Sequence, residues 1–110
     1  MSRSAQERFA DILAAIDRCV DYRPHLDDPE RRVASMAYDA VLRNLAVIGE
    51  AVRALPEAET AAMPEVSWAS IAGLRNVVVH EYFRIEPDLI ADILDNELRP
   101  LAEALRSRTD

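Results

Sequence analysis

Lysine is absent from the sequence, and glycine, cysteine and aromatic residues are scarce. The one cysteine, Cys19, excludes an internal disulfide bond, and no group of cysteine and histidine residues has the spacing of a metal site. Two glycines and 5% aromatic residues count against a β-sandwich or a β-barrel. The sequence also lacks any run of about 18 or more apolar residues, so a membrane-spanning helix is not expected.

The first residues, MSRSAQERFA, lack the apolar segment of a signal peptide, and we therefore expect a cytoplasmic protein. The 110 residues correspond to one domain, residues 1–110, and half of them are apolar. A core of this size is only marginally stable alone, so association with a second copy would help to stabilise it.

Acidic residues outnumber basic ones by 20 to 13, which gives a formal charge of −7, and all the basic residues are arginines. Proteins that bind nucleic acids without sequence specificity do so by neutralising phosphates with basic side chains. The charge therefore argues against a general nucleic-acid binder, and DNA is not an expected partner. Any chemistry on RNA would need a local basic site.

Apolar residues recur at intervals of three and four along most of the chain, which predicts amphipathic helices. The first helix is predicted from Ser4 to Tyr22. The second is predicted to begin at residues 28–30, with Asp28 as its N-cap, and to end at Pro56. Apolar residues cover more than one side of this second helix, which favours a bundle core on one side and a partner subunit on the other.

A third helix is predicted from about Trp68 to Tyr82, with Ser67 as its N-cap, and a fourth from Pro87, which Pro100 should kink or split. The three valines at 77–79 could instead form a β-strand, because β-branched residues favour strands. No other segment offers such a strand a partner, so a helix is favoured. The sequence thus predicts an all-α fold, an antiparallel bundle of four helices.

The eight-residue segment RNVVVHEY contains four residues that suit catalysis or binding: Arg75, Asn76, His80 and Tyr82. Successive residues of a helix are rotated by about 100°, so Asn76 and His80 are neighbours, whereas Arg75 and His80 are separated by about 140°. One straight helix cannot easily aim Arg75 and His80 at the same point. Two such helices meeting across a two-fold axis could do so, which favours a composite cleft in a homodimer.

The order Arg-x4-His-x-Tyr in this segment resembles the motif of the HepT branch of the HEPN superfamily. The similarity extends to IGEAV at residues 48–52 and to VSWASIAGLRNVVVHEYF at residues 66–83. A weaker similarity, ILDNELRPLAEAL, continues at residues 93–105.

This resemblance implies an α-helical, HEPN-like homodimer that cleaves RNA without a metal ion or another cofactor. It also implies the toxin of a type VII-like HepT/MNT toxin–antitoxin system, encoded beside an MNT-type nucleotidyltransferase that serves as the antitoxin. In that family, the tyrosine that corresponds to Tyr82 can be adenylylated by the antitoxin, which inactivates the toxin.

The residue types of the segment fit the cleavage of RNA. The 2′-hydroxyl of RNA can attack the adjacent phosphate, and this reaction requires a base, an acid and positive charge. A histidine exchanges a proton near neutral pH and the arginine fork binds phosphate oxygens, so His80 and Arg75 are the predicted catalytic residues. Asn76, Tyr82 and Glu50 are predicted to support them. Asn76 would orient His80 or bind the phosphate, Tyr82 would contact phosphate or a base, and Glu50 would orient Arg75 or His80.

Simpler interpretations are open at this point for each of these residues. His80 could be a structural histidine, Arg75 could pair with Glu81 or with an acid on another helix, Tyr82 could be ordinary packing, and Glu50 could be an ordinary surface charge. Two other functions are also open. One is a non-catalytic HEPN module that binds a nucleotide and is the modification target of a partner nucleotidyltransferase, and the other is a purely structural helical bundle.

Overall fold

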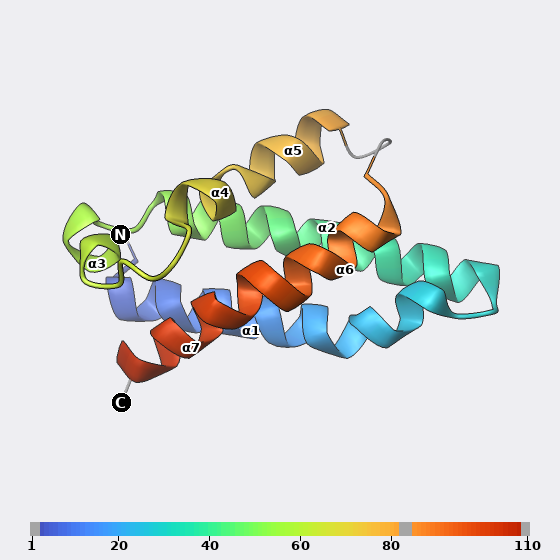
Figure 1. Cartoon of the computed structure of the whole chain (residues 1–110), viewed down its shortest axis with the longest axis horizontal. Coiled ribbons are helices and arrows are strands. Elements are labelled where there is room, and N and C mark those ends of the chain that lie inside the picture. The colour runs from blue at the N-terminus through green and yellow to red at the C-terminus, as the bar shows by residue number, and fades with distance from the viewer. Residues whose placement is uncertain (1–2, 82–84, 109–110) are drawn as a thin grey trace.

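All the secondary structure in the described part of the chain is helical, in a computed structural model that describes residues 3–81 and 85–108 (Figure 1). The all-α prediction is therefore confirmed. The α-helices are α1 (Ala5–Tyr22), α2 (Arg31–Arg53), α3 (Glu57–Ala61), α4 (Trp68–Ala72), α5 (Leu74–Glu81), α6 (Pro87–Ile93) and α7 (Arg99–Arg108). A 3₁₀ turn (Arg23–Asp27) follows α1, and a π turn (Leu94–Leu98) joins α6 to α7.

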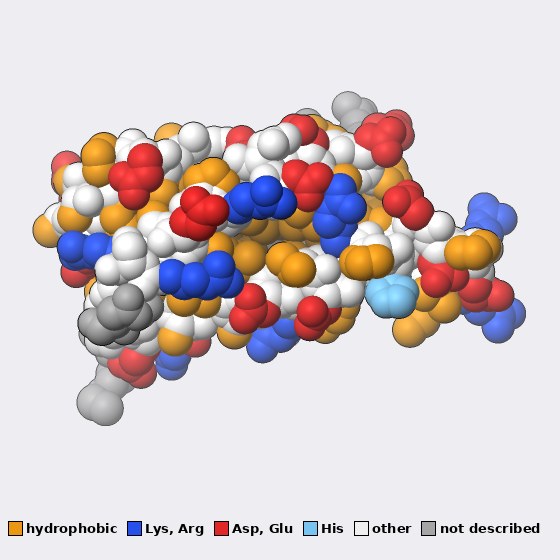
Figure 2. Space-filling model, turned by 60° about the horizontal axis from the view of Figure 1, so that its bottom comes forward, with side chains coloured by type: hydrophobic (Ala, Val, Ile, Leu, Met, Phe, Trp, Pro, Cys, Tyr) orange, Lys and Arg blue, Asp and Glu red, His pale blue; other side chains and the backbone are white. Residues whose placement is uncertain are grey.

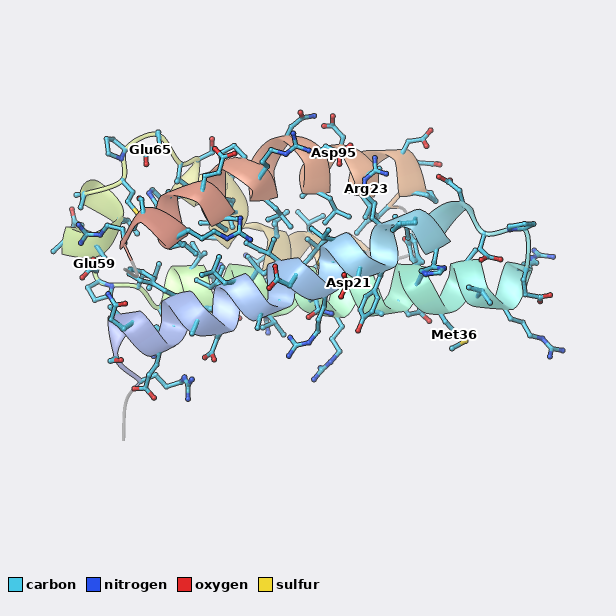
Figure 3. The ribbon with its side chains drawn as sticks, turned by 90° about the horizontal axis from the view of Figure 1, so that it is seen from below. Asp21, Arg23, Met36, Glu59, Glu65 and Asp95 are labelled. Atoms are coloured by element: carbon cyan, nitrogen blue, oxygen red, sulfur yellow. The ribbon has the colours of Figure 1, made fainter. Side chains whose placement is uncertain are left out.

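The longer helices are arranged as four rods, as the sequence predicted. α1 and α2 pack side by side, and α4 and α5 continue each other along another side of α2 (Figure 1). The fourth rod is made of α6, the π turn and α7. Figure 3 shows this rod on one side of α1 and α2, with Met36 pointing away from it on the opposite side.

The starts of the first two helices differ in how well the sequence predicts them. The first helix was predicted to begin at Ser4, and Ser4 is the N-cap of α1. Its hydroxyl accepts a hydrogen bond from the Glu7 N–H at 3.1 Å, and the Glu7 carboxylate accepts one from the Ser4 N–H at 3.0 Å. The predicted start of the second helix at Asp28 is wrong, since α2 begins at Arg31. The Asp28 carboxylate accepts the Glu30 N–H at 2.8 Å and so closes a local turn before the helix.

The third predicted helix is interrupted at Gly73, which separates α4 from α5. Ser67 occupies the N-cap position of α4 as predicted, although its side chain makes no capping hydrogen bond. The valines at 77–79 are helical, which confirms the choice of helix over strand. The predicted end of this helix at Tyr82 lies outside the described residues.

Pro100 divides the last rod, as expected. Proline has no N–H, and in an α-helix its ring clashes with the carbonyl of the residue four positions earlier. In this chain that residue is Asn96, which lies in the π turn. The wider backbone of a π turn relieves the clash.

Side chains from all four rods meet in one hydrophobic core. Its most deeply buried members include Phe9, Ile12, Val41, Leu45, Ile48, Ile71, Ile90, Leu98, Leu101 and Leu105. The three- and four-residue spacing of apolar residues includes Val20 in α1 and Met36 in α2 and predicts that both face the core, but they are 59% and 69% exposed. Cys19 is buried where Val20 was expected, and burial raises the pKa of its thiol to about 12.

The wide apolar surface of α2 is mostly covered within one chain. α1 packs against one side of α2, and α4 and α5 pack against another. Ala46 and Ala51 are half-buried in these contacts, which leaves Met36 and Val47 as the exposed large apolar residues of α2. The composition of α2 alone therefore does not require a partner subunit.

On the surface, acidic and basic groups are interspersed over the face that Figure 2 shows. The shortest ion pair ties the 3₁₀ turn to the π turn: Arg23 donates from Nε and Nη2 to the two carboxylate oxygens of Asp95, at 2.9 and 2.6 Å. This carboxylate raises the pKa of Arg23. No helix in the described residues is long and apolar enough to cross a membrane.

Candidate functional site

Gly49 allows the backbones of α2 and α5 to lie in direct contact. A Cβ atom on Gly49 would lie 2.8 Å from the backbone nitrogen of Arg75 and 3.1 Å from the carbonyl oxygen of Ile71. The 2.8 Å distance is shorter than real Cβ atoms show and the 3.1 Å distance is tighter than most, so glycine is the residue that fits at this point of α2. A glycine inside a helix costs about 1 kcal/mol relative to alanine. The close contact with the first turn of α5 offsets that cost and fixes the position of Arg75.

Glu50, the neighbour of Gly49, forms an ion pair with Arg75. The distance from its Oε2 to Arg75 Nε is 3.3 Å, and Arg75 Nη1 donates to the Asn76 side-chain oxygen at a long 3.5 Å. The side chains of Glu50 and Arg75 are 61% and 42% exposed, and an ion pair at this exposure contributes about 0–1 kcal/mol. Its effect is therefore on the direction of the Arg75 guanidinium more than on stability.

His80 lies in the last turn of α5, one turn after Asn76, and both residues are exposed. No hydrogen bond or ion pair joins His80 to another residue within the described ranges. Beside it, Val77 and Val79 are 38% and 47% exposed. The eight residues of α5 thus direct Arg75 toward α2, whereas the exposed side of the helix carries Asn76, His80 and two valines.

The structure brings together only part of the predicted site. Arg75, Asn76 and Glu50 are in contact, His80 is one helical turn from Asn76, and Tyr82 lies outside the described residues. No group of three or more His, Cys, Asp or Glu side chains in the described ranges is placed to hold a metal ion.

Asn44 is a residue to which the sequence analysis gave no role. It is the only polar side chain buried within the described ranges, at 6% exposure, and it contacts Arg18 on α1. Its burial could have been inferred from the sequence, because Asn44 lies at helical spacing among Val41, Leu45 and Ile48, which face the core.

Comparison with known proteins identifies the family of the chain. The model of the HepT-like family, described as ribonuclease HepT-like, matches residues 12–108. The chain belongs to the HepT-like ribonuclease family. This assignment confirms the predicted membership of the HepT branch and makes the chain a ribonuclease.

Several individual proteins resemble this HepT-like ribonuclease. A candidate RNase of Methanocaldococcus jannaschii, MJ0127, is 36% identical over 88 residues, which are 80% of this chain and 73% of that protein. A second candidate RNase of the same organism, MJ1380, is 32% identical over 96 residues, 87% of this chain and 88% of that protein. "Probable ribonuclease HepT" of Thermococcus cleftensis is 28% identical over 86 residues, 78% of each chain. No solved structure matches the chain significantly.

The contact at Gly49 predicts opposite effects for two glycine-to-alanine substitutions. Gly49→Ala should destabilise the protein by about 1–3 kcal/mol, because the new methyl group forces α5 away from α2. Gly73→Ala is the matched control, since its Cβ would meet carbonyl oxygens at an ordinary 3.4 Å, and it should be neutral or stabilising by up to about 1 kcal/mol. Urea unfolding monitored by circular dichroism measures both. If Gly49→Ala were as stable as Gly73→Ala, the close contact would not exist.

Proposed function

We propose that this chain is a metal-independent endoribonuclease toxin that acts as a homodimer in the cytoplasm, with residues 1–110 forming one domain. Arg75 and His80 are its catalytic residues, and Asn76, Tyr82 and Glu50 support them. The proposed antitoxin is an MNT-type nucleotidyltransferase that inactivates the toxin by adenylylating Tyr82.

The placement of Arg75 and His80 on different sides of α5 carries this proposal. Glu50 holds the Arg75 side chain toward α2, whereas His80 is exposed on another side of the same short helix. In one copy of the chain, the proposed phosphate-binding arginine and the proposed proton-transfer histidine therefore do not face the same cleft. A second copy related by a two-fold axis would place two histidines and two arginines around one cleft.

The exposed valines of α5 support a second copy at this position. Val77 and Val79 precede His80 by three residues and by one, and each exposes more than a third of its surface. Contact between two α5 helices would remove these apolar groups from water, which favours association. The same contact would bring the two His80 rings close together.

The chemistry that such a cleft can perform is cleavage by the RNA's own 2′-hydroxyl. One His80 accepts the proton of the 2′-hydroxyl while the 2′ oxygen forms a bond to phosphorus. The bond from phosphorus to the 5′ oxygen breaks, and the second His80 donates a proton to that oxygen. The products are a 2′,3′-cyclic phosphate and a free 5′-hydroxyl.

Arg75 stabilises the additional negative charge on the phosphate oxygens during this reaction. Its Nε contacts Glu50, and within the described residues Nη2 has no partner, so this end of the fork is available to a phosphate. Glu50 is a positioning residue in this scheme, because it touches Arg75 rather than the RNA. Asn76, one turn before His80 on the exposed side, orients the imidazole or contacts the phosphate.

The chain contains only two histidines, which provides a matched test of the catalytic assignment. His80→Ala should lower the rate of RNA cleavage by about 10²–10⁴ and abolish growth inhibition, because proton transfer is lost. His25→Ala should leave both unchanged, since His25 lies in the 3₁₀ turn and its contact is with Asp28, at 3.7 Å. Cleavage of a fluorescent RNA by the two purified variants is the measurement. A His80→Ala protein that still cleaves RNA and stops growth would refute the assignment.

The proposed role of Tyr82 is regulatory and therefore has a separate test. Tyr82 is two residues after His80 in the sequence. Adding AMP there places bulk and negative charge at the cleft, which excludes RNA by steric hindrance and by repulsion. Co-expression with the neighbouring nucleotidyltransferase should add the mass of one AMP unit to the protein and abolish cleavage.

Tyr82→Phe should show no such mass gain and should remain active in the presence of the nucleotidyltransferase, whereas Tyr38→Phe, the control, should be modified normally. Intact-mass spectrometry measures the modification. An AMP unit found on the Tyr82→Phe protein would contradict the regulatory role. Modification without loss of cleavage would favour a chain whose function is to receive the nucleotide.

A further inference from the structure

A groove runs along α1 and α2 on the face opposite the α6–α7 rod. Its larger hollow has a volume of about 490 Å³ and is lined by Arg18, Tyr22, Ala40, Arg43, Asn44 and Val47. A neighbouring hollow of about 340 Å³ shares Tyr22 and Ala40 with the first and also includes Met36. Figure 3 shows Met36 on this open face. The two hollows therefore form one groove with a polar end and an apolar end.

The buried amide of Asn44 organises the polar end of the groove. Its nitrogen donates to the Ala40 carbonyl at 2.8 Å, and its oxygen accepts a hydrogen bond from Arg18 Nη1 at 3.4 Å. A buried polar group is costly unless it is hydrogen-bonded, and these two bonds satisfy the amide. Arg18 is exposed, and this contact ties its guanidinium to the wall of the hollow.

The two arginines of the hollow have no carboxylate partner among the described residues. Five other arginines do have one: Arg3, Arg23, Arg75, Arg106 and Arg108. Asp21 and Asp39 lie one helical turn from Arg18 and Arg43, yet no ion pair forms between them. Two guanidinium groups that share one hollow repel each other, and an anion bound between them would remove this repulsion.

The register between α2 and α5 places this hollow at the level of His80. Arg75 lies against Gly49, and the Tyr38 hydroxyl donates to the Ile85 carbonyl oxygen at 2.7 Å. These two contacts show that the helices are antiparallel. His80 lies five residues after Arg75, so it is level with the residue five positions before Gly49, which is Asn44. His80 and the hollow are thus at a similar height along α2, on different sides of it.

We propose that the hollow between Arg18 and Arg43 binds a phosphate of the RNA strand away from the scissile phosphate, an inference that rests on the function proposed above. The planar forks of the two arginines bind the phosphate oxygens. The half-buried ring of Tyr22 offers a surface on which the attached base can stack. The site concentrates positive charge in a chain whose net charge is −7.

A two-fold contact between copies of the chain fits this hollow less well than a phosphate. An isologous interface places the same surface on both partners. Two copies packed through this hollow would bring two pairs of unpaired arginines toward each other, with no acid at the centre to compensate them.

The test uses an RNA oligonucleotide with 2′-O-methyl groups, which lacks the attacking hydroxyl and cannot be cleaved. The variants are Arg43→Gln, the double variant Arg18→Gln/Arg43→Gln, and the control Arg99→Gln on α7. Arg43 makes no hydrogen bond or ion pair with any described residue, so its substitution tests binding without disturbing the fold. Circular dichroism and size-exclusion chromatography with light scattering verify the fold and the oligomeric state.

The double variant should bind the RNA about tenfold more weakly than wild type, since it cannot form charged hydrogen bonds to a phosphate. Arg43→Gln should be weakened less, and Arg99→Gln should bind like wild type. The slope of log affinity against log salt concentration should become shallower by about 0.7, because the double variant neutralises one phosphate fewer. With cleavable RNA, KM should rise while kcat stays unchanged.

The possible results separate this proposal from the one on which it rests. If wild type binds and cleaves RNA but the double variant has the same affinity and KM, the phosphate site is wrong and the ribonuclease function stands. If the double variant changes the oligomeric state, the hollow is an interface between copies and the proposal is overturned. If wild type neither binds nor cleaves RNA, the proposed function itself fails.

Discussion

The contact between Gly49 and the backbone of Arg75 is the constraint on which the candidate site depends. It lets α5 lie directly against α2, and the Glu50 carboxylate next to it then reaches the Arg75 guanidinium. The ion pair itself is exposed and adds little stability. Its main effect is to orient the Arg75 side chain toward α2, whereas Asn76 and His80 on the same helix are exposed.

This division of α5 limits what one copy of the chain can do. A short helix that carries its arginine on one side and its histidine on another cannot surround a phosphate by itself. In the proposed homodimer, two copies would surround it together and would supply two histidines, one for each proton transfer. The acidic net charge adds a second requirement, since RNA must be attracted locally. Arg75 on α5 is one place where that attraction can act, and the pair formed by Arg18 on α1 and Arg43 on α2 is a second.

Periodicity and capping residues predicted the helices because these signals are local. The four rods, the cap at Ser4 and the interruption near Pro100 all follow from spacing or from the covalent geometry of proline. The start of α2 was predicted wrongly, because the Asp28 side chain hydrogen-bonds to Glu30 and closes a turn in place of a cap. Cys19 and Val20 are adjacent and about 100° apart around α1, and it is Cys19 that enters the core.

The site was predictable only where its residues are close in sequence. Arg75, Asn76 and His80 could be recognised as a segment, and the angle between Arg75 and His80 followed from helix geometry. The pairing of Glu50 with Arg75 and the contact of Arg18 with Asn44 join residues that are distant in the chain, and the packing of helices creates them. For Glu50, the sequence left the choice between a surface charge and a partner of Arg75 open, and the structure pairs it with Arg75.

The shared cleft is tested most directly by a mixed dimer of one wild-type chain and one His80→Ala chain. The two chains can be co-expressed with different affinity tags and purified in succession, so that each dimer contains one of each. If both histidines act in one cleft, the mixed dimer should be nearly as inactive in RNA cleavage as the His80→Ala homodimer. A mixed dimer with half the activity of wild type would show that each chain carries its own complete site, and would contradict the account.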